Sequence, residues 1–317
     1  MSGRTTRWGD AFGRLALAGL SMAAQASPGT GSADAGVVAE VAMGDESQDA
    51  PLVRLDPQGL PLVLPGLERS RASPRRVVLQ GHAESVRQGP WSASVSADLM
   101  HQRAPDTPGF DQRALTLQPT VHHLAGPVGV GLGWQWQRFD VAGAPLRRVQ
   151  GWQLDLSRAG LGHSTSLMAS WQRWRHPGEL AFMDARTSGL SLSRLWLPAG
   201  RLERAVLTLQ LEREHNEGGH AELSRRTASL QGATGWRLGR WSTGLGGFWQ
   251  TARHDRPLDE GLGLRVDRAR GLDVAVAHPV GPDLSLRLGW EAVEVRSRQA
   301  LAVMSWRRVG VSLRWEP

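Results

Sequence analysis

The sequence predicts an all-β fold, a transmembrane antiparallel up-and-down β-barrel, and three observations support this fold class. Apolar and small or polar residues alternate along most of the chain, and short connections alternate with long ones between the strand-like segments. The third observation is that no run of about 18 or more apolar residues is present to form a spanning helix. A chain of 317 residues suits one mid-sized barrel or two soluble domains, and the alternation favours the barrel.

Residues 127–138, PVGVGLGWQWQR, show the strand pattern most clearly. Every second residue from Val128 to Trp136 is apolar, whereas glycine or glutamine occupies the positions between them. Since successive side chains of a strand point to opposite faces, one face here is apolar and the other is small or polar. This pattern is typical of a strand that separates lipid from a barrel interior.

The same pattern recurs almost to the C-terminus and predicts about twelve strands, with fourteen as the alternative. The first begins at Trp91, and the others lie near residues 113–125, 127–139, 148–160, 162–175, 186–197, 203–215, 223–238, 240–253, 266–279, 283–296 and 303–315. Residues 77–88 form a possible further strand with poor alternation, which requires an earlier partner, for example near 60–67. An even number of strands places both chain ends in the periplasm.

The connections between these segments alternate in length. Tight turns rich in Gly and Pro are expected near residues 125–127, 159–160, 198–200, 239–240 and 281–282. Longer polar loops are expected at 104–112, 140–147, 175–185, 214–222, 254–265 and 296–302. A soluble β-sandwich or propeller, the alternative class, predicts no such two-period alternation, whereas outer-membrane barrels have short periplasmic turns and long extracellular loops.

The N-terminal quarter divides into two segments before the barrel, which is expected at residues 77–317. Residues 1–26 fit a secretory signal peptide that ends at Ala24-Gln25-Ala26, with an amphipathic first helix as the alternative. Residues 27–76 are rich in Gly, Ala, Ser, Asp and Pro and predict a disordered periplasmic segment or plug. Within it, residues 60–67 (LPLVLPGL) could be a plug segment, a partner-docking peptide or an irregular edge.

Composition limits the chemistry and the partners. The chain has no cysteine, which excludes disulfides, thiolate nucleophiles and sulfur-ligated metals. It also has no tyrosine, so its 14 tryptophans are expected to form the aromatic girdles of the barrel. The net charge of +7 comes from scattered arginines without a basic cluster, which argues against a nucleic-acid partner and indicates a solvated surface or one that faces outer-membrane lipid and lipopolysaccharide.

Along each predicted strand, the positions that alternate with the apolar residues are expected to face the barrel lumen. They are Asp98, Gln135, Gln137, Asp155, Gln210, Glu212, Arg237, Asp273, Arg287, Glu291, Arg308 and Arg314. Mixed charges in a narrow barrel are expected to pair with one another, which predicts at most a narrow and weakly ion-selective pore. A ladder of arginines that guides anions along the wall is the alternative.

Catalytic and metal-binding patterns are weak. The stretch His163-Ser164-Thr165-Ser166 contains the residue types of a hydrolase, but its serines already fit the lumen-facing parity. The stretch from His215 to His220 contains two histidines, but no helix is predicted to preorganise them around a metal ion. The chain is therefore predicted not to be an enzyme and to need no metal or cofactor.

Two stretches carry a resemblance to a known family. Arg296-Ser297, followed by residues 305–315 (SWRRVGVSLRW), resembles the closing hairpin of the surface lipoprotein assembly modifier family. Residues 186–200 (RTSGLSLSRLWLPAG) are similar to a barrel strand of that family that ends at a Pro-x-Gly turn. The resemblance implies a fourteen-strand barrel that helps lipoproteins reach the cell surface, with a surface lipoprotein as its client.

The last strand also predicts how the protein reaches its membrane. Val309, Val311, Leu313 and Trp315 alternate and end in an aromatic residue, which resembles the C-terminal signal recognised by the barrel-assembly machinery. We therefore expect a protein of the outer membrane of a Gram-negative bacterium. Its expected function is assembly or translocation of the lipoprotein-modifier type, with a small general diffusion porin as the alternative.

Overall fold

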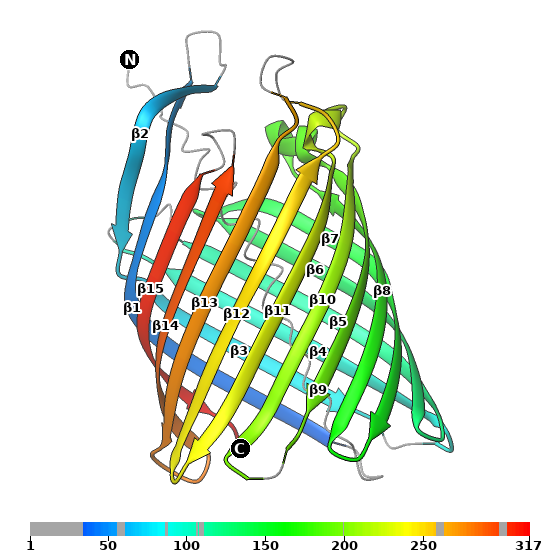
Figure 1. Cartoon of the computed structure of the whole chain (residues 1–317). Coiled ribbons are helices and arrows are strands. Elements are labelled where there is room, and N and C mark those ends of the chain that lie inside the picture. The colour runs from blue at the N-terminus through cyan, green and yellow to red at the C-terminus, as the bar shows by residue number, and fades with distance from the viewer. Residues whose placement is uncertain are drawn as a thin grey trace.

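The computed structural model in Figure 1 describes residues 34–55, 61–85, 88–105, 107, 111–198, 200–257, 263–297 and 303–317. For residues 34, 50–55 and 61–69 it describes the backbone alone. The predicted signal peptide, residues 1–26, lies outside the described residues. No helix among the described residues is long and apolar enough to cross a membrane.

Fifteen strands and two short 3-10 helices make up the described chain. They are β1 (Asp34–Leu55), β2 (Pro61–Ala72), β3 (Arg75–Glu84), β4 (Trp91–Arg103), β5 (Gln112–Ala125), β6 (Val128–Val141), β7 (Ala144–Gly160), β8 (His163–Arg175), η2 (Gly178–Met183), β9 (Ala185–Trp196), β10 (Leu202–Asn216), η3 (Ala221–Leu223), β11 (Arg225–Leu238), β12 (Trp241–His254), β13 (Val266–Pro279), β14 (Leu284–Ser297) and β15 (Met304–Trp315).

The strands form one antiparallel sheet that closes on itself. Neighbours in sequence pair from β3 to β15, and β1 pairs with β3 on one side and with β15 on the other. In Figure 1 the blue β1 accordingly lies beside the red β15. The result is a closed barrel of fourteen strands, so the predicted number of twelve is wrong and the alternative of fourteen is confirmed.

The two extra strands are β1 and β3, and β1 corrects the predicted start of the barrel. Residues 34–55 fall in the segment predicted to be disordered, and the barrel begins at β1 rather than at residue 77. Along β1, Val37, Val41 and Met43 are exposed on one parity, whereas Glu46 and Gln48 are buried on the other. The segment is therefore amphipathic at period two, and pairing on both edges stabilises its backbone although its overall composition is poor in large apolar residues.

Strand β2 does not add a fifteenth strand to the barrel wall, because it shares one edge of β1 with β3. It pairs with residues 46–55 of β1, and β3 pairs with residues 34–43 on the same edge. Residues 50–55 have no pairing to β15 within the described residues, so the β1–β2 hairpin rises past the end of β15, as Figure 1 shows. The predicted irregular stretch at 60–67 is thus largely strand, with a register shift in β1 between Pro51 and Val53.

The two faces of the wall follow the predicted alternation. On β7, Trp152, Leu154 and Leu156 are 56%, 42% and 46% exposed, while Arg147 and Val149 on the other parity are buried. Since no described residue covers these side chains, exposed leucines and tryptophans require a lipid environment to be stable. Of the tryptophans, Trp134, Trp152 and Trp171 lie directly opposite one another on β6, β7 and β8 and form part of an outer girdle.

Glycines on the inner face of β6 make room for polar neighbours. A Cβ at Gly133 would lie 2.9 Å from Thr120 Oγ1 and 3.0 Å from Gln153 Cγ, and one at Gly131 would lie 3.1 Å from His122 Nδ1. The glycine repeat of the sequence is therefore explained by close packing of side chains from β5 and β7 across the inner face of β6.

The alternation of connection lengths is present with one exception. Strands β6 and β7 are joined by residues 142–143 alone, so the long loop predicted at 140–147 is wrong. Ala142 and Gly143 both have positive φ, 51° and 78°, which gives the two-residue hairpin that matches the twist of antiparallel strands. The extracellular end is identified by the long connections that contain η2 and η3, and the C-terminus lies at the opposite end (Figure 1).

Candidate functional site

The inner face of the barrel is the candidate site. All twelve residues expected to face the lumen lie on the parity opposite to the exposed apolar side chains of their strands; on β6, for example, Gln135 lies on the parity opposite to Val130 and Leu132. The structure joins Glu291 of β14 to Arg308 of β15 in an ion pair of 2.8 Å. By contrast, Arg237 and Arg314 pair with Glu203 and Glu316, near the turns at the periplasmic end.

A first group of inner charges lies where the barrel closes, on β3, β1, β15 and β14; we call it the seam cluster (Arg76, Glu46, Trp306, Arg308 and Glu291). The indole Nε1 of Trp306 donates a 2.6 Å hydrogen bond to Glu46 Oε1, and the Arg308 guanidinium lies 5.1 Å from the Trp306 ring centroid. Arg76 interacts electrostatically with Glu46 and Glu291. The cluster joins the two ends of the sheet through side chains as well as through the backbone ladder.

A second group lies on the inner face at the extracellular end; we call it the mouth cluster (Arg147, Glu212, Glu214 and Arg225). Arg225 of β11 donates a 2.9 Å hydrogen bond from Nε to Glu214 Oε2 on the neighbouring β10. Arg147 belongs to β7, three strands from β10, and it is only 4% exposed while it interacts electrostatically with Glu212 and Glu214. Charges of non-neighbouring strands therefore face one another across the interior.

Polar side chains extend the mouth cluster along the wall. The Gln172 amide donates a 3.0 Å hydrogen bond to Gln135 Oε1, and Trp174 Nε1 donates one of 3.2 Å to Gln172 Oε1. The Trp174 ring in turn lies 4.6 Å from the guanidinium carbon of Arg147. These contacts run over β6, β8 and β7 and hold Arg147 in place toward the interior.

On the other side of the mouth cluster, His254, Arg265 and Asp267 form a compact group at the start of β13. Arg265 Nη2 lies 2.7 Å from Asp267 Oδ2, and His254 Nε2 lies 3.4 Å from the same oxygen. His254 Nδ1 also lies 2.9 Å from the carbonyl oxygen of Glu222. The group attaches the connection that contains η3 to the barrel wall.

The carboxylate of Asp184 anchors the connection between β8 and β9. Its Oδ1 accepts a 2.7 Å hydrogen bond from the backbone N–H of His176, and Arg175 Nη1 lies 2.5 Å from its Oδ2. Burial raises the pKa of Asp184, but these two donors outweigh it, so the pKa lies below its usual range. Burial, together with the positive charge of Arg147, also lowers the pKa of His176.

Both shifts predict that this connection loosens in acid. A lowered pKa contributes stability above the unfolded-state value, about 6.5 for His and 3.9 for Asp, and this stability is lost as the pH falls through the folded-state values. We expect amide protection factors in residues 176–184 to fall when the pH is lowered from 7.5 to 5, first through His176. Asp184→Asn should lower them at both pH values, whereas Glu179→Gln on the exposed side of η2 should not. Protection that is independent of pH would contradict this assignment.

Several members of these clusters were not predicted from the sequence. Arg147 lies in a stretch, 140–147, that the sequence predicts as a longer polar loop, and Glu46 and Arg76 lie in the segment that it predicts as disordered. Arg225 lies at the first residue of β11, where strand parity is difficult to fix. Parity along β1 identifies Glu46, parity along β3 identifies Arg76, and the two-residue turn at 142–143 places Arg147 within a strand.

The weak catalytic and metal-binding patterns are not assembled into sites. No group of three or more metal-ligating side chains is found among the described residues. His220 Nδ1 lies 2.7 Å from Glu222 Oε1, and His163 Nδ1 lies 3.1 Å from the carbonyl oxygen of Leu161. The expectation that the chain is not an enzyme stays a prediction.

Comparison with known proteins finds solved structures of similar fold but no matching family. No protein-family model matches the sequence, and no curated protein sequence matches it. Among solved structures, the chain is similar to OmpTdeltaL8, a loop L8 deletion mutant of the Vibrio cholerae outer membrane protein OmpT. The TM-score is 0.51 and the identity 6%, over 90% of this chain and 100% of that one. In-vitro folded OmpT of Vibrio cholerae gives a TM-score of 0.50 at 7% identity, over 93% and 100% of the two chains.

The fold and the polar inner face together define an outer-membrane β-barrel of the kind found in Gram-negative bacteria. An anion-selective porin from Comamonas acidovorans is also similar, with a TM-score of 0.47 at 12% identity over 90% of this chain and all of the porin. The likeness to the OmpT structures, at such low identity, concerns the fold.

Proposed function

We propose that the protein is a passive diffusion channel for small hydrophilic solutes across the outer membrane. The observation that carries this proposal is the polar and charged inner face, with carboxylates and guanidiniums that meet from non-neighbouring strands in the mouth cluster. Charged side chains are costly to place inside a lipid-embedded barrel unless water or opposite charges solvate them. A water-filled interior lined by both signs satisfies that requirement.

The mixed charge of the two clusters supports a narrow and weakly selective channel. The mouth cluster contains two arginines and two glutamates, so it has no net charge when all four are ionised. A lumen lined by equal numbers of both charges is expected to restrict the size of the solute more strongly than its charge. The proposed substrates are therefore small polar molecules and ions of either sign.

Planar-bilayer conductance of the purified, refolded chain tests this function. We expect steady single-channel conductance with cation and anion permeabilities of similar size. Glu212→Gln should shift the permeability ratio toward anions, because the mouth cluster then carries a net positive charge. Glu294→Gln removes a carboxylate from the outer face at the same end of the barrel and should leave the ratio unchanged. A refolded barrel without conductance would contradict the channel function.

We also propose assembly or translocation of a surface lipoprotein as a second candidate function. Its support is the resemblance of residues 186–200 and 296–315 to the lipoprotein assembly modifier family, which implies a barrel of fourteen strands. The β1–β2 hairpin that rises past β15 would provide a contact for a protein client (Figure 1). An electrically silent barrel that captures a lipoprotein in a pull-down would favour this candidate, and a conducting barrel that captures none would contradict it.

The predicted assembly signal lies at an accessible place in the fold. Val309, Val311, Leu313 and Trp315 are 49%, 43%, 44% and 43% exposed on the outer face of β15. We propose that the barrel-assembly machinery recognises this face of the strand, which an unfolded precursor presents before β15 pairs with β1.

A further inference from the structure

The outer face carries a row of arginines that the channel function does not use. On β10, β11 and β12, Arg213 lies directly opposite Arg226, and Arg226 lies directly opposite Arg253. All three are exposed and share the parity of the exposed leucines and tryptophans of their strands, such as Leu211, Leu230 and Trp249. They therefore point away from the barrel, at the end that carries the long connections.

The row continues around most of the barrel. Arg75 lies opposite Arg103, Arg148 lies between Arg138 and Arg175, and Arg173 lies opposite Arg186. Farther along, Arg268 of β13 lies opposite Arg296 of β14. With Arg113 of β5, Arg270 of β13 and Arg307 of β15, every strand from β3 to β15 carries an outward arginine at its extracellular end. We call this set the outer arginine belt.

The belt is confined to one end of the barrel. At the periplasmic end the outward arginines on the strands are Arg158 and Arg194, which share the parity of Leu156 and Leu192. Tryptophans occupy much of that boundary instead, among them Trp91, Trp241 and Trp315, which are 54%, 51% and 43% exposed. The asymmetry indicates that the belt matches a feature of the outer leaflet which the inner leaflet lacks.

Like charges placed directly opposite one another on adjacent strands destabilise a sheet. Carboxylates of the protein neutralise some members of the belt: Glu217 forms an ion pair with Arg173, and Glu294 forms ion pairs with Arg270 and Arg296. Arg148, Arg213, Arg253, Arg268 and Arg307 have no ion pair with any residue that the structure describes. The wall therefore presents cationic groups that anions from outside the chain would neutralise.

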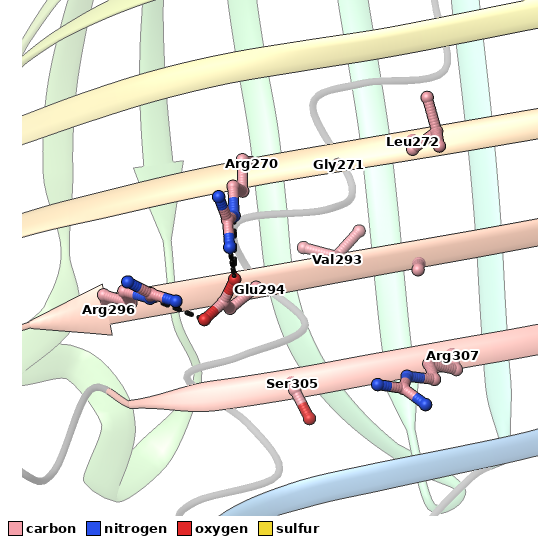
Figure 2. A pocket seen from close by; sticks show the side chains of 9 residues that line it. Arg270, Gly271, Leu272, Val293, Glu294, Arg296, Ser305 and Arg307 are labelled. Atoms are coloured by element: carbon pink, nitrogen blue, oxygen red, sulfur yellow. Dashed lines mark hydrogen bonds and ion pairs between the residues drawn. The ribbon is translucent and has the colours of Figure 1, made fainter.

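A hollow on the outer face shows what such an anion would meet. Figure 2 shows Arg270, Arg296 and Arg307 around it on β13, β14 and β15, with Glu294 paired to the first two. The hollow has a volume of about 500 Å³, and three arginines against one glutamate leave it a net charge of +2. Leu272, Ala292 and Val293 are also among the residues that line the hollow, so its lining combines positive charge with apolar side chains.

We infer that the outer arginine belt binds the phosphate groups of a phosphorylated glycolipid in the outer leaflet. Guanidinium groups bind phosphate through paired hydrogen bonds, and the apolar band directly below the belt contacts acyl chains. In a phosphorylated amphiphile that spans both regions, the phosphates neutralise the belt and the acyl chains cover the apolar side chains. The inference depends on the membrane placement of the barrel and not on the channel function.

Binding of lipid A by the refolded full-length chain tests this inference. The probes are bis-phosphorylated lipid A and the same lipid after removal of both phosphates, each in mixed micelles of a zwitterionic detergent. We expect wild-type protein to bind the phosphorylated form and to unfold at a higher temperature in its presence, with little effect of the dephosphorylated form. R213Q/R253Q should bind phosphorylated lipid A about thirtyfold more weakly, from about 1 kcal/mol for each arginine near an anionic surface.

The matched control is R158Q/R194Q, which removes two outward arginines from the periplasmic end and should retain wild-type affinity. In detergent without lipid A, R213Q/R253Q should unfold at the same temperature as wild type or at a higher one, because cross-strand repulsion is relieved. Equal binding of both lipids by the wild type would overturn the inference without any variant. Equal loss of affinity in both double variants would overturn it as well.

Discussion

Gly44→Val is expected to prevent closure of the barrel. Gly44 lies on β1 opposite Gly310 of β15, where the first and last strands of the barrel meet. A Cβ at Gly44 would collide with the carbonyl oxygen of Val309 and lie 2.8 Å from the Cα of Gly310. Because these are backbone atoms, a rotamer change cannot relieve the clash, and β1 must move away from β15. We expect a loss of about 3 kcal/mol or more in the free energy of unfolding.

The measurement is heat-modifiable migration on a gel after refolding into lipid vesicles, with unfolding in guanidinium to quantify the loss. Gly36→Val provides the control on the same strand and the same face, because a Cβ at Gly36 meets no atom within 4 Å. Gly36→Val should refold with a free energy of unfolding within about 0.5 kcal/mol of wild type. Equal behaviour of the two variants would show that close approach at the seam does not limit closure.

The seam also shows which part of the fold the sequence predicts well. Strands β4 to β15 are predictable because each buries or exposes residues at period two over ten or more positions, and lipid imposes an apolar face on each one. Strand β1 has a short alternating core followed by Asp45, Glu46 and Asp49, and its composition resembles that of a disordered segment. Its stability comes from pairing with β15, which is more than 250 residues away in the sequence, and that contact has no local signal.

The candidate site also has a part that the sequence predicts and a part that it does not. Parity predicts that Glu212, Glu291 and Arg308 share the inner face, because it depends only on position within a strand. Parity does not give the partner of each charge, because a partner such as Arg147 reaches Glu212 from three strands away across the interior. The predicted pairing of lumen charges therefore has particular partners that only the closed barrel specifies.

Arg225→Gln is expected to have the second large effect, through the mouth cluster. Arg225 and Glu214 lie directly opposite each other on β11 and β10, and their side chains are 24% and 12% exposed. Removing the guanidinium leaves Glu214 and Glu212 close together with Arg147 as their main cation. Loss of one partner of a buried ion pair costs about 3–5 kcal/mol, and partial exposure here reduces the expected loss to about 2–3 kcal/mol.

The comparison with Arg296→Gln separates burial from charge. Arg296 pairs with Glu294 at 2.5 Å, but its side chain is 68% exposed on the outer face, so its loss should change the free energy of unfolding by less than about 1 kcal/mol. Arg225→Gln/Glu214→Gln should recover much of the stability lost in Arg225→Gln, because it removes the uncompensated carboxylate. Guanidinium unfolding of wild type, Arg225→Gln, Glu214→Gln, the double variant and Arg296→Gln in phospholipid vesicles gives each value. If the double variant is as unstable as the sum of the two single variants, Glu214 and Arg225 stabilise the wall independently and the mouth cluster is not a coupled unit.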